Sequence, residues 1–141
     1  MNPAPGYSGK TLREKLGVKP GHRVAVIGYD GDWPALVGAD DVVFEHTALD
    51  VIHLFVTTEA ALRAGLQTAL PMLADRGMIW VSWPKKASGV PTEIVEDLIR
   101  TVALPMGIVD VKVCAVTDVW SGLKLVRRRA GGEVTRDGTP R

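Results

Sequence analysis

The chain has 141 residues, which fits one domain, and a domain of this length buries roughly 68% of the surface that its unfolded chain would expose. Seventeen basic residues against sixteen acidic ones give a formal net charge of +1, far from the basic excess that binding to nucleic acid requires. The single cysteine excludes an internal disulfide, and no stretch approaches the ~20 apolar residues of a membrane span, so we expect a protein of the reducing cytoplasm that is neither inserted nor exported.

The start of the chain predicts an extended arm followed by a short helix. Residues 1–10 contain two prolines and two glycines and show no helical or strand periodicity. Thr11 and Glu14 have the spacing of a capping box, and Gly17 stands where a helix needs a left-handed residue at its C-terminal end. The sequence therefore predicts one helix over residues 12–16.

Three apolar runs predict strands of a largely parallel sheet. HRVAVIG (22–28) and DVIHLFVT (50–57) are continuously apolar, which is typical of strands buried on both faces, and the second is predicted to be the most central. Residues 42–44 predict a brief strand, and the loop GYDGDWP (28–34) before it can lead into a short helix.

Two further helices are predicted in the second half of the chain. Thr58 is the expected N-cap of the first, and Pro71 and Gly77 end that segment before the strand MIWVSW (78–83), which completes a β-α-β unit. Its apolar positions, at helical spacing, are Leu62, Leu66, Leu70 and Leu73. Thr92 is the expected N-cap of the second helix. The apolar stripe of that helix consists of Ile94, Val95, Leu98, Ile99 and Val102.

The end of the chain predicts an antiparallel hairpin, because apolar residues there alternate with polar ones. Its strands are residues 108–116 and 122–129, at the edge of the sheet, and residues 130–141 predict a flexible tail. The sequence thus predicts a single α/β domain over residues 11–129. It is expected to be Rossmann-like, with a mostly parallel sheet, helices on both faces and a C-terminal antiparallel hairpin.

Two resemblances follow from the order of these segments. LGVKPGHRVAVIG (16–28), DVIHLFVT (50–57) and LADRGMIWVSW (73–83), followed by the hairpin, resemble the scaffold of class I methyltransferases. Three further strings resemble a family of short bacterial proteins, frequent in actinobacteria, that is known only as a domain of unknown function, and this resemblance extends over nearly the whole chain apart from the tail. These strings are GYSGKTLREKLGVKPGHRVAVIG, WVSWPKKASGVPTE and DVKVCAVTDVWSGLKLVRRR. The first resemblance implies a Rossmann-like fold, and the second implies no reaction and no catalytic residue.

The loop WPKKASGVPT is the leading candidate for a ligand site. Its candidate residues are Lys85, Lys86, Ser88, Gly89 and Thr92. The two lysines supply positive charge, the Ser-Gly pair allows a tight turn, and the threonine opens a predicted helix whose free amides and dipole attract anions. The loop also follows a parallel strand at its carboxyl end, where open α/β sheets place ligands. The sequence therefore predicts phosphate or carboxylate binding here, with ordinary solvated surface as the other interpretation.

The turn after the first strand is the alternative ligand site. In Rossmann folds, glycines at this turn let the backbone approach a nucleotide cofactor. Gly28 and Gly31 match that pattern loosely, and Glu45, at the end of the second strand, can hydrogen-bond a ribose. These three residues would hold S-adenosylmethionine in a divergent methyltransferase. Apart from that alternative, no cofactor is predicted.

Other residues that often carry chemistry have simpler explanations in this sequence. His22, His46 and His53 lack the spacing of metal ligands, so no metal site is predicted. His53 stands inside an apolar strand and is expected to be a core residue with satisfied hydrogen bonds. Cys114 has no identified base and is expected to be an inert, buried thiol.

Three functions remain in competition. The leading one is a non-enzymatic module that binds a small anion or a protein partner at the carboxyl ends of the strands, because the sequence contains no nucleophile and base pair, no paired catalytic carboxylates and no intact cofactor fingerprint. The alternative is a divergent S-adenosylmethionine-dependent methyltransferase. The third is a structural oligomer, such as a homodimer, that pairs through the edge of the hairpin.

Overall fold

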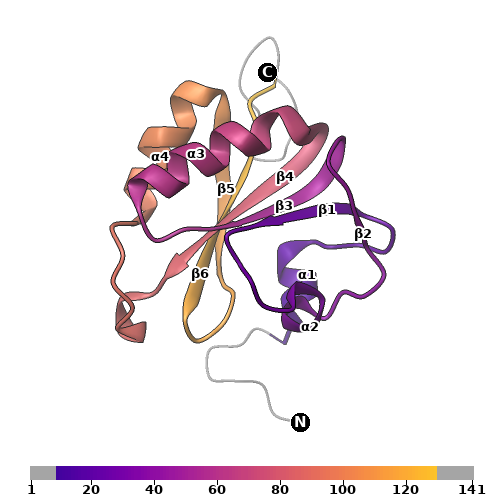
Figure 1. Ribbon diagram of the computed structural model, residues 1–141, viewed down its shortest axis with the longest axis horizontal. Helices are drawn as coiled ribbons and strands as arrows, with labels where there is room; N and C mark the ends of the chain where they lie inside the picture. Colours follow the sequence, from indigo (N-terminus) through magenta and orange to yellow (C-terminus); the bar gives the residue numbers. More distant parts are fainter. Residues whose placement is uncertain (1–8, 130–141) are drawn as a thin grey trace.

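A six-stranded sheet forms the centre of the computed structural model, which describes residues 9–129 (Figure 1). The strands are β1 (Arg23–Ile27), β2 (Val43–Phe44), β3 (Leu49–Phe55), β4 (Leu73–Pro84), β5 (Ile108–Ala115) and β6 (Trp120–Arg127). The helices are α1 (Leu12–Leu16), α2 (Trp33–Val37), α3 (Glu59–Ala69) and α4 (Glu96–Ala103), with 3-10 turns η1 (Leu70–Met72), η2 (Lys86–Ser88) and η3 (Leu104–Met106). The arm predicted at residues 1–10, apart from Gly9 and Lys10, and the tail predicted at residues 130–141 lie outside the described residues.

The strand order is β2-β1-β3-β4-β6-β5, and the first four strands are parallel. β6 pairs antiparallel with β4 on one side and with β5 on the other, so the last strand within residues 9–129 lies inside the sheet and β5 forms its edge. The prediction of a mostly parallel sheet that closes with an antiparallel hairpin is confirmed.

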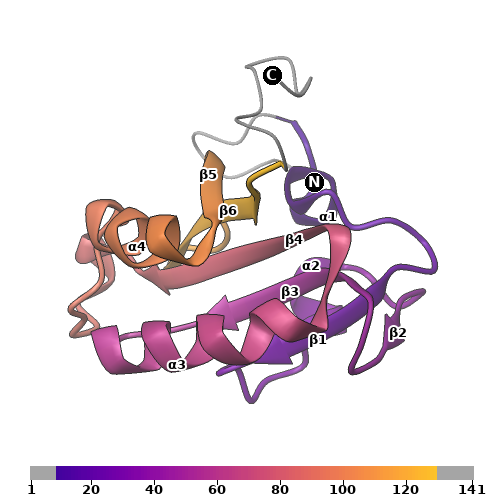
Figure 2. The same cartoon turned by 90° about the horizontal axis from the view of Figure 1, so that it is seen from above.

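The two faces of the sheet carry separate cores, and helices cover both (Figures 1 and 2). Successive side chains of β3 alternate between them, as the pleat of a strand requires. Ile52 and Leu54 join the core beneath α3 and α4, whereas Val51 and Phe55 join the core beneath α1 and α2. All four side chains are almost fully buried, which explains why this run of sequence is continuously apolar.

The helix predicted over residues 12–16 is confirmed at both ends. The Thr11 hydroxyl accepts a hydrogen bond from the Glu14 amide at 3.2 Å, and the Glu14 carboxylate accepts one from the Thr11 amide at 2.8 Å, which completes the capping box. Gly17 ends the helix with φ of +77°. The Trp80 indole N–H donates to the Leu16 carbonyl at 2.9 Å, so the end of α1 is fixed over β4.

The prediction that Leu73 belongs to the helix after Thr58 is wrong. That helix ends four residues earlier, because Pro71 has no backbone N–H to continue it and the chain passes through η1. Leu73 is instead the first residue of β4. Gly77 does not end the helical segment either, since it lies within β4, where a Cβ atom would overlap the Leu49 carbonyl oxygen.

The prediction that Thr92 caps the second helix is also wrong, because α4 begins at Glu96. The Thr92 hydroxyl donates to the Thr57 carbonyl at 3.2 Å and accepts from the Ile94 amide at 3.0 Å, which holds this segment extended against the end of β3. Val95, predicted to lie on the buried stripe, occupies the N-cap position and is 56% exposed.

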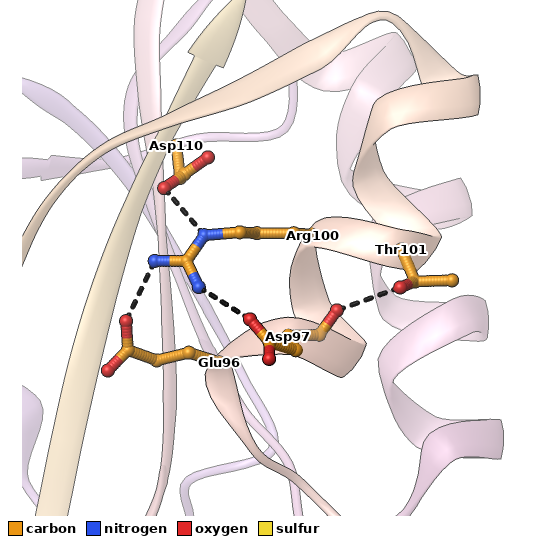
Figure 3. A network of polar contacts seen from close by, with 5 residues as sticks. All are labelled: Glu96, Asp97, Arg100, Thr101 and Asp110. Carbon is orange, nitrogen blue, oxygen red and sulfur yellow. Dashed lines mark hydrogen bonds and ion pairs between the residues drawn. The ribbon is translucent and has the colours of Figure 1, made fainter.

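An ion-pair network fixes α4 to the edge of the sheet (Figure 3). The Arg100 guanidinium donates to Asp110 of β5 at 2.9 Å, to Glu96 at 2.8 Å and to Asp97 at 3.0 Å. These carboxylates raise the pKa of Arg100 above its ordinary value, chiefly through the hydrogen bond with Asp110. One guanidinium is therefore shared by three carboxylates, and the network has a negative formal charge.

Within residues 9–129, no helix is both long enough and apolar enough to cross a membrane. The longest helix there, α3, has 11 residues, well short of the ~20 that a bilayer core requires.

Candidate functional site

The topology of the sheet identifies where a ligand would be expected. From β1 the chain passes to β2 on one side, whereas β3 lies on the other side of β1 and leads on to β4. The strand order therefore reverses between β1 and β3. In open α/β sheets, ligands bind outside the carboxyl ends of the strands at such a switch point. In this chain the position is bounded by Gly28, after β1, and by Phe55, at the end of β3.

Residues of the chain contact one another at this position. Gly28 has φ of +85°, and a Cβ atom there would overlap the Phe55 carbonyl oxygen, so the loop after β1 lies directly on the end of β3. The Tyr29 ring stacks on the Phe55 ring with centroids 4.8 Å apart and planes at 28°. Gly31 packs on the same tyrosine, since a Cβ atom there would lie 2.7 Å from the phenol Cζ. Both loop glycines thus make room for contacts within the chain.

Glu45, the third residue of the cofactor alternative, lies apart from these glycines along the strands. In the parallel pairing, Phe44 aligns with Val24, so β2 ends well before β1 does. Glu45 is therefore about 10 Å short of Gly28 along the strand direction, at roughly 3.3 Å per residue. Its carboxylate lies 3.8 Å from the Arg23 guanidinium, and both side chains are 40% exposed.

The loop between β4 and α4 uses its hydroxyl groups internally. The Ser88 hydroxyl donates to the Lys85 carbonyl at 2.7 Å and accepts from the Val90 amide at 3.1 Å, while Gly89 turns the chain with φ of +76°. The Thr92 hydroxyl is engaged with backbone groups, as described above. Of the five residues predicted to bind an anion, the two hydroxyl side chains therefore serve the loop itself.

A carboxylate already occupies the nearby N-terminus of α3. Glu93 Oε1 accepts a hydrogen bond from the Glu59 amide at 2.8 Å, and the Glu93 amide donates to the Thr57 carbonyl at 2.8 Å. Glu93 therefore complements the positive end of the dipole of α3. Sequence reasoning missed this contact because Glu93 and Glu59 are 34 positions apart.

Two lysines and several apolar side chains remain exposed at this end of the sheet. Lys86 is exposed, Lys85 is half-buried, and within residues 9–129 neither ammonium group has an acidic partner. The Lys85 amide donates to the Val119 carbonyl at 2.7 Å, which joins this loop to the turn between β5 and β6. Val119 and Val90 are 37% and 41% exposed. We refer to residues 85–95 and 116–120 together as the carboxyl edge.

His53 is part of a buried network that sequence reasoning did not foresee. The Trp33 indole N–H donates to His53 Nδ1 at 3.0 Å, and His53 Nε2 lies 2.7 Å from the Ser82 hydroxyl oxygen. Because Nδ1 accepts, Nε2 carries the proton and donates it to Ser82. Burial lowers the pKa of His53 to about 3, so the ring is neutral near pH 7.

This histidine and serine do not form a catalytic pair. A general base must accept a proton at the nitrogen that faces the nucleophile, whereas His53 Nε2 already donates one to Ser82. Both residues are 0% exposed. The expectation that His53 is a core residue with satisfied hydrogen bonds is confirmed.

Two further predictions concern the Cys114 thiol and metal binding. Cys114 is half-buried, and burial raises the pKa of its thiol despite the opposing charges of Lys15 and Lys112. Among residues 9–129, no group of three or more histidine, cysteine or acidic side chains could hold a metal ion.

The fold is similar to those of several solved methyltransferases. A putative type 11 methyltransferase from Sulfolobus solfataricus matches with a TM-score of 0.61 and 15% identity, over 89% of this chain and 94% of that chain. A SAM-dependent methyltransferase from Aquifex aeolicus matches with a TM-score of 0.56 and 14% identity, over 79% and 85%. A TehB-like SAM-dependent methyltransferase from Corynebacterium glutamicum matches with a TM-score of 0.55 and 10% identity, over 84% and 88%. At these identities the similarity shows a shared fold.

In sequence, residues 13–129 match a family described as "Protein of unknown function (DUF3052)". No curated protein matches the sequence.

Proposed function

The chain belongs to the DUF3052 family, and we propose that it is a non-enzymatic, methyltransferase-like module that binds a protein partner through its carboxyl edge. The observation that carries the proposal is the set of contacts that the chain makes with itself at the switch point between β1 and β3. The Tyr29 ring stacks on Phe55 where this architecture receives a ligand, and Gly28 abuts the Phe55 backbone.

The alternative is a divergent S-adenosylmethionine-dependent methyltransferase, which is favoured by the fold of the similar structures. Such an enzyme would need Gly28, Gly31 and Glu45 around one cofactor. The glycines pack on Phe55 and Tyr29, and the glutamate faces Arg23, so each of the three residues already contacts another part of this chain. These contacts support the non-enzymatic reading.

We expect isothermal titration with S-adenosylmethionine and with S-adenosylhomocysteine to show no binding at ligand concentrations up to about 1 mM, a limit that corresponds to roughly 4 kcal/mol of binding free energy. Tyr29→Ala removes the stacked ring, and Tyr29→Phe is the matched control that retains it. Binding that appears only in Tyr29→Ala would show that the ring closes the crevice and would agree with the proposal. Micromolar binding by the unmodified chain would overturn it in favour of the methyltransferase.

A protein partner fits the carboxyl edge better than a small anion does. Small anions are bound by converging backbone amides and hydroxyl groups, whereas here Ser88 and Thr92 are engaged internally and α4 begins beyond the loop. What remains accessible is a mixture of exposed valines and lysine side chains, which is typical of a protein interface with a polar rim.

We therefore expect phosphate at 10 mM to raise the melting temperature of the unmodified chain and of Lys85→Ala/Lys86→Ala by the same amount. The double substitution itself should change the free energy of unfolding by no more than about 0.5 kcal/mol, since within residues 9–129 neither lysine has an acidic partner and surface substitutions away from such contacts have small effects. Thermal unfolding with and without phosphate measures both effects. A rise that is lost in the double variant would assign a small-anion site to these lysines instead.

A further inference from the structure

A transverse row of side chains crosses the face of the sheet that α1 and α2 cover in part. The pairing register aligns His53 of β3 with Trp80 of β4, Trp80 with Lys124 of β6, and Lys124 with Lys112 of β5. His53 and Trp80 are 0% exposed, whereas Lys124 is half-buried and Lys112 is exposed. Cys114, Trp120 and Val126 of the hairpin still pack against the core beneath α1 and α2, whereas the cover is incomplete over Lys124 and leaves Lys112 open to solvent.

Two like charges stand directly opposite each other on that face. Side chains at such paired positions are about 4.5–5.5 Å apart at Cβ, and like charges there destabilise a sheet. Burial lowers the pKa of Lys124, and the charge of Lys112 lowers it further. Within residues 9–129 neither lysine pairs with a carboxylate, since Asp110 of the same hairpin is held by Arg100 on the opposite face.

An irregularity in β5 creates this arrangement. The pairing register shifts between Asp110 and Lys112, so that Lys112, and not Val111, stands opposite Lys124. A β-bulge of this kind re-aims the side chains that follow it. The valine at the shift is 51% exposed. A regular strand would have placed an apolar residue opposite Lys124 and avoided the repulsion.

Lys15 adds a third positive charge beside the pair. It lies at the end of α1, and both Lys15 and Lys112 are close enough to Cys114 for their charges to act on its thiol. We refer to Lys112 and Lys124 as the lysine face. Val109 and Val126, which are paired across β5 and β6, are half-buried on the same side of the hairpin.

We propose that the lysine face binds an acidic segment of a partner protein, separately from the carboxyl edge. Positive charges that repel one another in the free protein are complementary to a chain of carboxylates, which would relieve that repulsion. The half-buried valines offer apolar contact to the rest of the segment. Nucleic acid does not fit, because the two lysines are fewer than the 6–10 phosphate contacts of proteins that bind it. A small anion would find no converging amides, since those of β6 are hydrogen-bonded on both sides within the sheet.

The repulsion can be tested in the free protein. Lys112→Gln removes one of the paired charges and is expected to raise the melting temperature by about 1–3 °C, in 50 mM salt, where surface charges are weakly screened. Lys19→Gln removes an exposed lysine at a distant turn as the control and should leave the melting temperature within about 1 °C. A fall in melting temperature with Lys112→Gln would show that this lysine is structural and would overturn the proposal.

Binding is tested by titration calorimetry with poly-L-glutamate as the acidic chain. Lys112→Gln/Lys124→Gln is expected to weaken its affinity about tenfold, whereas Lys19→Gln/Arg76→Gln, which removes the same formal charge from exposed positions elsewhere, should leave the affinity within twofold. Equal losses in both double variants would mean nonspecific attraction and would overturn the proposal. Inorganic phosphate that binds the unmodified chain and not the first double variant would also overturn it, in favour of a small-anion site.

Discussion

Replacing Gly28 with alanine is expected to lower the free energy of unfolding by about 2–5 kcal/mol. Two penalties add at this position. The φ of +85° is unfavourable for any residue with a Cβ atom, and that atom would overlap the carbonyl oxygen of Phe55, a backbone group that cannot rotate away as a side chain can. Urea denaturation of the purified variant measures the difference from the unmodified chain.

Gly21→Ala is the matched control for this substitution. Gly21 has a similar φ of +78°, but nothing lies within 4 Å of the position that its Cβ atom would take. Gly21→Ala should therefore lower the free energy of unfolding by only about 1–2 kcal/mol, through backbone strain. If Gly28→Ala were no more destabilising than Gly21→Ala, the loop would not lie tightly on β3. The space beside Gly28 would then be available to a ligand, and the proposal of a closed crevice would fail.

Acid is expected to destabilise the fold through His53, by about 2 kcal/mol between pH 7.5 and pH 5. The unfolded chain takes up a proton on this histidine below pH 6.5, whereas burial keeps the folded ring neutral down to about pH 3. The unfolded state thus binds more protons throughout this window. The contribution of His53 to the free energy of unfolding is therefore fully present above pH 6.5 and declines as the pH falls toward 3.

His53→Gln provides the comparison that isolates this effect. A glutamine side chain offers an acceptor to Trp33 and a donor to Ser82 but does not titrate. We expect the variant to be less stable at pH 7.5, because the imidazole also stacks on Phe55 at 4.1 Å, and to show a flatter dependence of stability on pH. His22 and His46 are present in both proteins, so their contributions cancel. Urea denaturation at pH 7.5 and at pH 5 measures the free energy of unfolding of both proteins. An equal change in the two proteins would contradict the assignment of this pH dependence to His53.

The elements that could be predicted are those governed by neighbouring residues. The capping box of Thr11 and Glu14 and the left-handed Gly17 specify α1 within a few positions of sequence. Thr58, which accepts from the Ala61 amide at 3.1 Å, likewise marks the start of α3. The continuous apolar run around Ile52 predicted a strand buried on both faces because each of its faces meets a separate core.

The errors arise where distant residues compete for the same groups. Thr92 is a suitable N-cap by type, but the Thr57 carbonyl takes its hydroxyl proton, and the helix begins four residues later. The next residue, Glu93, accepts a hydrogen bond from the first amide of α3. No spacing rule connects residues that are 34 positions apart, so this exchange of partners becomes visible only in three dimensions.

The sequence could predict where the parallel strands end, but not the contacts that the side chains make there. The carboxyl ends of β1 and β4 could be located from the strand pattern, and because these strands are parallel within one sheet, the loops after them lie at the same end of it. What the pattern could not give is that Tyr29 stacks on Phe55, a residue of another strand. The cross-strand pair of Lys112 and Lys124 could not be predicted from the sequence either, because the register shift in β5 determines which residue of β5 lies opposite Lys124.

The interior position of β6 has a consequence for how this chain acquires its structure on the ribosome. Parallel strands β1, β3 and β4 emerge first, yet the free side of β4, from Met78 to Pro84, is paired only by β6, which ends at Arg127. Until that late segment has been synthesised, the nascent chain presents an unpaired apolar edge that contains Ile79 and Val81, both fully buried in the finished domain. Completion of the sheet therefore waits for nearly the whole domain to leave the exit tunnel, and the interval before it is when the chain most needs chaperone protection.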